Sequence, residues 1–193
     1  VGVSGNARRW APRWWCAWLA LRLPRYFPAS MVSAGWRRAM LRDGAQPFTV
    51  DLEDGAHLDA LYFPTAADVG HRLPVILNHG YLESKEFHRR EVRLLREAGH
   101  DVVLYDLRGH GRSGGRYTTL GVHEQDDLTH LIDACQQRGY MKDRVITMGY
   151  STGAAVVIQQ APSDERVAGV VALTPFVDMI GAIKSFHKVT AKW

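Results

Sequence analysis

Apolar and polar positions alternate along residues 47–62 in a way that predicts the first ordered element of the domain. Apolar side chains occupy every second position of the runs 48–52 and 58–62, which is the period of a strand with one buried face. Asp54 and Gly55 lie between the two runs, and this pair favours a tight turn because its second residue tolerates positive φ. The pattern therefore predicts an antiparallel β-hairpin.

Four continuous apolar runs follow the hairpin, each short enough to be a strand that is buried on both faces. They cover residues 74–78, 102–105, 145–148 and 167–173. Helical periodicity separates these runs. A helix over 85–98 would turn Phe87, Val92, Leu94 and Leu95 inward, Leu128, Leu131, Ile132 and Cys135 would share one helix face, and two more helices are expected over 154–158 and 178–187.

Strands with continuous apolar interiors that alternate with helices are typical of a parallel sheet covered on both faces. The predicted fold class is α/β, a three-layer α/β/α sandwich with a mostly parallel sheet and an N-terminal antiparallel hairpin. The 193 residues, 46% apolar and 23% charged, have ordinary globular composition and the length of one domain. The two cysteines, Cys16 and Cys135, form neither a disulfide framework nor a metal-ligand spacing, so we expect no metal and no cofactor.

The net charge of +4 conceals an uneven distribution along the chain. Residues 1–42 contain eight arginines and no acidic residue, and residues 1–36 hold five of the six tryptophans. The rest of the chain holds the other 16 basic residues and all 20 acidic residues, a net charge of −4. We therefore divide the chain into a basic Trp/Arg-rich arm, residues 1–45, and a domain, residues 46–193.

The role of the arm stays open between packing on the domain and peripheral contact of residues 1–42 with an anionic membrane, which suits arginine and tryptophan. No nucleic-acid partner is expected, because the domain carries no basic stripe. A helix between Pro12 and Pro24 would be roughly 16 Å long, about half of a hydrocarbon core. Arg22 follows the apolar stretch too soon for a signal peptide. We expect a cytoplasmic protein, with membrane association as the alternative.

The segment Gly149-Tyr150-Ser151-Thr152-Gly153 lies between a predicted buried strand and a predicted buried helix. In that position G-x-S-x-G is the pattern of a nucleophile elbow, a sharp turn that lifts the serine hydroxyl clear of the sheet. The two glycines leave room for the neighbouring chain, and the helix that follows points free N–H groups at the same place. Ser151 is therefore the candidate catalytic nucleophile.

The first predicted parallel strand ends in His79-Gly80-Tyr81, where a second oxyanion donor belongs. The backbone N–H groups of Tyr81 and Thr152 are the candidates for an oxyanion hole. The side chain of His79 is expected to brace this loop rather than to take part in the chemistry.

Residues 109–114 match G-x-G-x-x-G after a strand, the pattern of a dinucleotide-binding loop. Such a loop should open a helix directly and be followed by an acidic residue at the end of the next strand. Here an irregular stretch, residues 117–121, comes next, and Asp133 falls in a helical pattern. Nucleotide binding is therefore disfavoured.

Five segments, taken in order, resemble the α/β-hydrolase fold family in its lipase-like and serine-aminopeptidase-like branch. They are LPVILNHGY, GHDVVLYDLRGHGRSGG, TLGVHEQDDL, VITMGYSTGAAVV and VAGVVALTPF. The resemblance implies a serine hydrolase, carboxylesterase-like, lipase-like or a peptidase, that cleaves a small-molecule ester or amide through an acyl-enzyme. Thioesterases and acyltransferases share these motifs, so they specify the fold better than the reaction. In the family Arg108, His110 and Ser113 usually hold the loop after the strand that ends at Asp106.

The same resemblance implies a catalytic triad in the chain order Ser, Asp or Glu, His. Only His187 follows Ser151, and Asp178 with His187 would satisfy the order. The acid and the histidine belong on loops after two further strands, so we expect residues 46–193 to be a partial α/β-hydrolase domain whose triad is completed downstream. The chain alone would then be poorly soluble and inactive. The alternative is a non-catalytic or truncated α/β-hydrolase-like protein that acts as a binding or membrane-associated module.

Overall fold

The computed structural model of the chain describes residues 22, 29–65 and 72–176. The helix predicted between Pro12 and Pro24 lies outside these residues, apart from Arg22. The helix predicted over 178–187, and with it Asp178 and His187, also lies outside the described residues.

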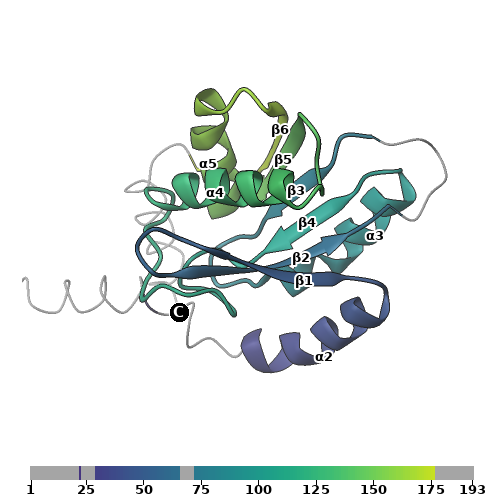
Figure 1. Ribbon diagram of the computed structural model, residues 1–193. Coiled ribbons are helices and arrows are strands. Elements are labelled where there is room, and N and C mark those ends of the chain that lie inside the picture. Colours follow the sequence, from purple (N-terminus) through teal and green to yellow (C-terminus); the bar gives the residue numbers. More distant parts are fainter. Residues whose placement is uncertain (1–21, 23–28, 66–71, 177–193) are drawn as a thin grey trace, which may run out of the picture.

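A six-stranded sheet forms the middle of the molecule, in the order β1-β2-β4-β3-β5-β6 (Figure 1). The strands are β1 (Gln46–Asp51), β2 (His57–Phe63), β3 (Val75–Asn78), β4 (Val102–Tyr105), β5 (Val145–Tyr150) and β6 (Val167–Leu173). Strand β2 pairs antiparallel with β1 and β4, whereas β3 runs parallel to β4 and β5, and β5 runs parallel to β6. The predicted α/β class, with a mostly parallel sheet and an N-terminal hairpin, is confirmed.

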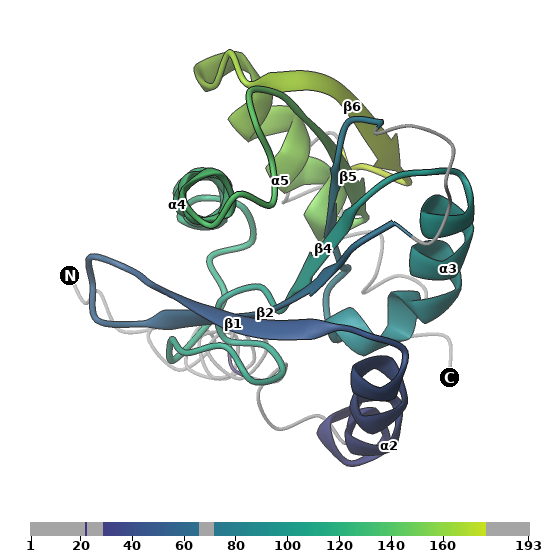
Figure 2. The ribbon, with the colours of Figure 1, turned by 45° about the vertical axis from the view of Figure 1, so that its right-hand side comes forward.

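Helices cover both faces of the sheet (Figures 1 and 2). On one face α4 (Glu124–Gln137) and α5 (Thr152–Gln160), which continues into the 3-10 turn η3 (Ala161–Ser163), enclose a core cluster with β1, β2 and β5. On the other face lie α2 (Ala29–Arg42), the 3-10 turn η2 (Lys85–His88) and α3 (Arg89–Glu97). The four residues predicted to share one helix face are all buried in α4: Leu128, Leu131, Ile132 and Cys135.

The hairpin turn forms at the predicted pair of residues. Gly55 has φ of +78°, the conformation that favours glycine, and Asp54 accepts the N–H of Ala56 at 3.1 Å. Arg108 reaches this turn at 2.8 Å from Asp54 and forms a two-pronged contact with Asp127 of α4, at 2.7 and 2.6 Å. The guanidinium thereby ties the hairpin, the loop after β4 and α4 together.

Three predicted apolar faces are less buried than the sequence indicated. Phe87 and Leu94 are 42% and 51% exposed, while Val92 is buried. For Phe87 the cause is the 3-10 turn over residues 85–88, whose three-residue period sets this residue on a different face from that of a continuous α-helix. Leu94 lies two positions after the buried Val92, which is about 200° around the helix axis. Ile158 of α5 is 46% exposed, and β6 leaves Val170 and Val171 exposed because, in the described part of the chain, it pairs with β5 alone.

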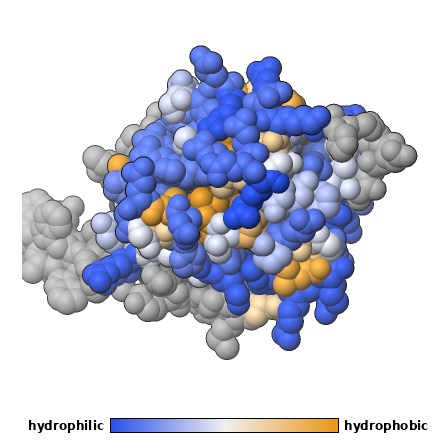
Figure 3. Space-filling model, viewed as in Figure 1, coloured by the Kyte–Doolittle hydropathy of each residue, from blue (hydrophilic) through white to orange (hydrophobic). Residues whose placement is uncertain are grey.

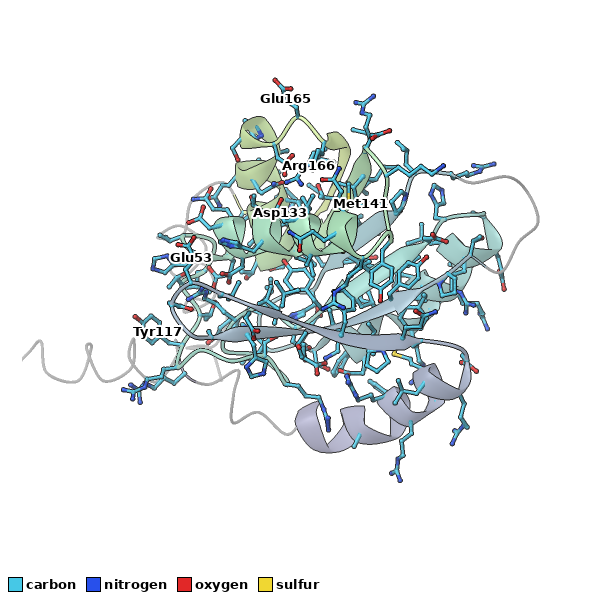
Figure 4. All side chains as sticks on the ribbon, viewed as in Figure 1. Glu53, Tyr117, Asp133, Met141, Glu165 and Arg166 are labelled. Atoms are coloured by element: carbon cyan, nitrogen blue, oxygen red, sulfur yellow. The ribbon has the colours of Figure 1, made fainter. Side chains whose placement is uncertain are left out.

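Hydrophilic residues dominate the face drawn in Figure 3, where they separate the hydrophobic patches. Charged side chains also organise the fold. Arg166, just before β6, lies 2.7 Å from Asp133 of α4 and 2.8 Å from Asp164 (Figure 4). This contact fixes the entry to β6 against the helix layer.

A buried cluster of charges lies beneath α2, where the Lys85 ammonium is completely enclosed. Its Nζ contacts Asp106 at 2.5 Å and Asp59 at 2.7 Å, and Arg37 of α2 contacts the same Asp59 at 2.7 Å. Burial opposes the charged form of Lys85, but Asp106, Glu86 and Asp59 outweigh it and raise the pKa of the amine. The lysine therefore stays charged, and its positive charge balances the negative charges of the neighbouring carboxylates.

Residues 29–42 of the predicted arm form α2, which packs on the domain. Met40 is buried in the same core cluster as Leu61 and Val92, and Trp36 meets Phe87 edge-on with ring centroids 5.1 Å apart. The division of the chain at residues 45 and 46 stays a prediction. Across the described ranges, no helix combines the length and apolar character that crossing a bilayer requires.

Replacing the buried lysine should destabilise the full-length protein strongly. Lys85→Met would leave the fully buried Asp106 without its ammonium partner, at a cost of about 3–5 kcal/mol in the free energy of unfolding, whereas Asp59 would keep its contact with Arg37. Arg93→Met removes one partner of an exposed pair with Glu97, 3.9 Å apart, and should cost less than about 1 kcal/mol. Urea unfolding followed by circular dichroism compares the two, and equal losses would contradict the assigned role of Lys85.

Candidate active site

Ser151 occupies a sharp turn between β5, which ends at Tyr150, and α5, which begins at Thr152. Its φ of +49° and ψ of −108° are rare for a residue with a side chain, at a cost of about 1–3 kcal/mol. Hydrogen bonds hold it there: the N–H of Ser151 donates to Leu173 of β6 at 2.9 Å, and its carbonyl accepts from Ala155 at 3.1 Å. The hydroxyl-bearing residue is half-buried, so it reaches the surface.

The two flanking glycines allow backbone segments to approach closely. A Cβ on Gly149 would lie 2.6 Å from the amide nitrogen of Ala154, and one on Gly153 would lie 2.6 Å from the carbonyl oxygen of His79. Atoms at these distances overlap, so only glycine fits either position. Gly153 thereby brings the start of α5 against the end of β3.

The loop after β3 lies directly beside Ser151. A Cβ on Gly80 would be 3.6 Å from Cβ of Ser151, which places Gly80 beside the side chain of Ser151. Leu82 in this turn also has positive φ, +63°. Tyr81 is half-buried in the turn, and Thr152 is the first residue of α5, a position whose N–H has no partner within its own helix.

Two buried histidines support this loop as neutral rings. His79 donates from Nδ1 to the carbonyl of Gly80 at 2.7 Å and accepts the N–H of Leu107 at Nε2, 2.9 Å away. Burial, together with the nearby His110, lowers the pKa of His79 to about 3. Burial also lowers the pKa of His110, whose ring lies edge-on to that of His79 at 5.0 Å. The bracing contacts of His79 match the role predicted for it.

The glycine-rich loop 109–114 folds back on itself and on Asp106. The N–H of Arg112 donates to the Asp106 carboxylate at 2.8 Å, and the hydroxyl of Ser113 donates to the Asp106 carbonyl at 2.5 Å. His110 donates from Nδ1 to the Arg108 carbonyl at 2.9 Å. The helix that follows begins only at Glu124, so the loop does not open a helix as a dinucleotide-binding loop does.

Two residues beside the site carried no recognised motif. Glu83 accepts the N–H of Gly80 at 2.8 Å, and His88 lies 3.3 Å from the same carboxylate oxygen. The His88 ring also stacks on Tyr150, with centroids 4.7 Å apart. An acidic residue three positions after Gly80 is the only signal in the sequence that could have indicated them.

In the part of the chain that the structure describes, no hydrogen bond to the Ser151 side chain identifies a base, and no group of side chains forms a metal centre. No hydrogen bond links the Ser151 side chain to a histidine across residues 29–65 and 72–176. Nor do three His, Cys, Asp or Glu side chains gather there as metal ligands do. The described site therefore brings together a hydroxyl, a helix N-terminus and an adjoining turn.

The parallel sheet with helices on both faces, and a glycine-flanked serine between β5 and α5, define an α/β hydrolase. A family model described as serine aminopeptidase, S33, matches residues 70–193. This match covers more than half of the chain, and the chain belongs to that family.

Solved structures agree with this assignment. The esterase Pf2001 of Pyrococcus furiosus is 27% identical, with 77% of this chain and 56% of that chain covered at a TM-score of 0.68. XC6422 of Xanthomonas campestris, described as a member of the α/β serine hydrolases without lid, is 27% identical over 65% of this chain and 60% of that chain, with a TM-score of 0.51.

A sequence relative extends the comparison. The protein YqkD of Bacillus subtilis (strain 168), described as uncharacterized, is 29% identical over 87 residues, which is 45% of this chain and 28% of YqkD. The chain thus spans 56% and 60% of the two solved relatives and 28% of YqkD. The activity of the whole protein is accordingly a proposal.

Enlarging Gly153 should disturb the site and the fold together. Gly153→Ala puts a methyl group into the carbonyls at the end of β3 and should lower the free energy of unfolding by about 1–3 kcal/mol. Gly169→Ala in β6 meets no atom within 4 Å and serves as the matched control, with a change within about 0.5 kcal/mol. Thermal unfolding of the full-length variants measures both, and a Gly153→Ala protein as stable as the control would contradict the close approach.

Proposed function

We propose that the protein is a serine hydrolase that cleaves a carboxylic ester through an acyl-enzyme, with Ser151 as the nucleophile. The observation that carries the proposal is the conformation of Ser151, φ +49° and ψ −108°, at the junction of β5 and α5. A strained residue at the N-terminus of a buried helix is expected where function requires that conformation. The positive end of α5 would also favour the negative charge that develops there.

In the proposed reaction the Ser151 hydroxyl oxygen bonds to the carbonyl carbon, and a histidine outside the described residues takes the hydroxyl proton. The tetrahedral intermediate then expels the alcohol, which receives that proton, and leaves an acyl-enzyme. Water attacks the acyl-enzyme by the same route, releases the carboxylic acid and restores Ser151. Asp178 and His187 remain one candidate pair for the acid and the base.

Two amides beside the site already donate hydrogen bonds within the protein. The N–H of Ser151 donates to Leu173, and the N–H of Gly80 donates to Glu83, so neither is available to a substrate oxygen. The amides of Thr152 and Tyr81, which the sequence indicated, are therefore kept as the proposed donors because of their positions after the turn and after β3. Each such donor stabilises a transition state by roughly 3–4 kcal/mol.

An ester is favoured over an amide by the similar solved structures, since Pf2001 is described as an esterase. The family description, a serine aminopeptidase, keeps cleavage of an amide as the alternative chemistry. A non-catalytic binding protein on the same fold is the alternative of a different class. An acid and a histidine encoded after two further strand patterns would favour the enzyme, and their absence would favour the binding protein.

Labelling the full-length protein with a fluorophosphonate probe tests the nucleophile. The wild type should bind one probe per chain and hydrolyse p-nitrophenyl acetate, whereas Ser151→Ala should take up no probe and lose at least about a thousandfold in kcat/KM. Ser163→Ala, a serine of η3 away from the turn, is the control and should behave as the wild type. Probe retained on the Ser151→Ala protein would rule out this nucleophile.

We also propose peripheral contact with an anionic membrane through residues 1–42, extended by the outward side of α3. Exposed arginines and exposed apolar side chains occur on the same elements, α2, η2 and α3: Arg38, Arg42, Arg89, Arg90 and Arg93 with Leu41, Phe87 and Leu94. The two helices lie together, because Arg89 stacks 4.4 Å from the Trp36 ring and Arg96 contacts the carbonyl of Asp43. This combination of charge and apolar surface fits a lipid interface.

Vesicle binding tests this contact. Arg38→Gln, Arg42→Gln and Arg90→Gln together should weaken binding of the full-length protein to phosphatidylserine-containing vesicles by about 1 kcal/mol per arginine. The control replaces Arg112, Lys142 and Arg144, which are exposed elsewhere, and changes the net charge equally. Cosedimentation with vesicles at low and high salt is the measurement. If both triple variants weaken vesicle binding equally, binding depends on net charge alone and the proposed contact surface is wrong.

A further inference from the structure

We propose that Glu83 is a positioning residue, which holds the turn carrying Tyr81 in register with Ser151 through hydrogen bonds to Gly80 and His88. The inference rests on the proposed function, because it assigns the Tyr81 N–H its orientation toward the oxyanion.

Glu83 closes the turn at residues 80–83. The Glu83 carboxylate accepts the N–H of Gly80 at 2.8 Å, and the N–H of Glu83 donates back to the Gly80 carbonyl at 3.3 Å. Leu82 lies between them with φ of +63°, a conformation that costs energy for a residue with a side chain. Two hydrogen bonds from one residue therefore hold a turn that is not favoured locally.

His88 links this turn to Tyr150, the residue before the proposed nucleophile. Because a carboxylate only accepts, the hydrogen bond at 3.3 Å requires His88 to donate from Nε2 to Glu83. The ring of His88, itself 5% exposed, stacks on Tyr150 at 4.7 Å and an interplanar angle of 28°. Tyr150 is bonded directly to Ser151, so the chain of contacts runs from the Tyr81 turn to the strained serine.

The surroundings of Glu83 favour this role over that of a general base. Its hydrogen bond with His88 and the N–H of Gly80 lower the pKa of Glu83, although burial acts in the opposite direction. A carboxylate with a lowered pKa is a weak proton acceptor at neutral pH. One oxygen of the Glu83 carboxylate already accepts hydrogen bonds from two donors. The same oxygen would lie 3.1 Å from a Cβ on Gly80, so the carboxylate packs closely against the turn.

The positioning role has a distinct kinetic consequence. A donor aimed at an oxyanion contributes only when negative charge develops on the oxygen, and its misplacement lowers kcat more than it raises KM. A residue that binds the substrate itself would change KM instead. The amide of glutamine can still accept the N–H of Gly80, so it should replace the carboxylate in large part.

The experiment compares Glu83→Ala, Glu83→Gln and His88→Phe in the full-length protein, with p-nitrophenyl acetate as substrate. Glu83→Ala should lower kcat by about 10- to 100-fold, with KM within about threefold of the wild type, and Glu83→Gln should restore kcat to within about fivefold. His88→Phe keeps an aromatic ring on Tyr150 but loses the hydrogen bond, so it should lower kcat by about three- to tenfold. Glu97→Ala, an exposed acid at the end of α3, is the matched control.

Three results would overturn the proposal: an unchanged kcat in Glu83→Ala, a change confined to KM, or a Glu83→Gln variant as impaired as Glu83→Ala. Circular dichroism and the melting temperature show whether Glu83→Ala folds. If it does not, the other two variants test the proposal. A wild-type kcat in His88→Phe, or a tenfold loss of kcat in Glu83→Gln, then rejects the positioning role of Glu83. Fluorophosphonate labelling separates this failure from that of the proposed function. A wild type that labels at Ser151 leaves Glu83 as the only claim at issue, whereas a wild type that does not label removes both.

Discussion

The close approach of α5 to the end of β3 is the constraint on which the rest of the site depends. Gly153 lies against the carbonyls of Asn78 and His79, where a Cβ would overlap the backbone. This contact brings two segments 70 residues apart, the turn at Ser151 and the loop at Tyr81, to one edge of the sheet. Parallel strands end at the same edge of the sheet, so the fold brings the two segments together, and Gly153 sets the distance between them.

Buried polar groups beneath the site hold these two segments in position. Asp106 follows β4 and receives the ammonium and the backbone N–H of Lys85 together with the N–H of Arg112, while neutral His79 joins the loop at Gly80 to Leu107. A buried charge with one partner removed is strongly destabilising, so these groups oppose drift of either loop. The active-site edge is thus stiffened by interactions that take no part in the proposed reaction.

The sequence predicted the sheet, the hairpin and the two central helices because these follow from periodicity and from local turn chemistry. Gly55 and the apolar face of α4 are examples in which local preference and tertiary structure agree. Periodicity failed at Phe87, where a 3-10 turn replaced the expected α-helix. Periodicity also could not predict the contact between Glu83 and His88. A hydrogen bond between side chains five residues apart depends on backbone angles, which no pattern of apolar positions encodes.

The strained conformation at Ser151 has a consequence for how the chain could change over time. Glycine tolerates φ of +49° without the steric cost that a side chain brings there, so Ser151→Gly is a rare substitution that would add stability while removing the proposed chemistry. A chain selected for robustness alone would drift toward that glycine. Keeping the serine is therefore a trade-off between stability and the proposed chemistry. The strained backbone lowers stability at the position where a hydroxyl is needed.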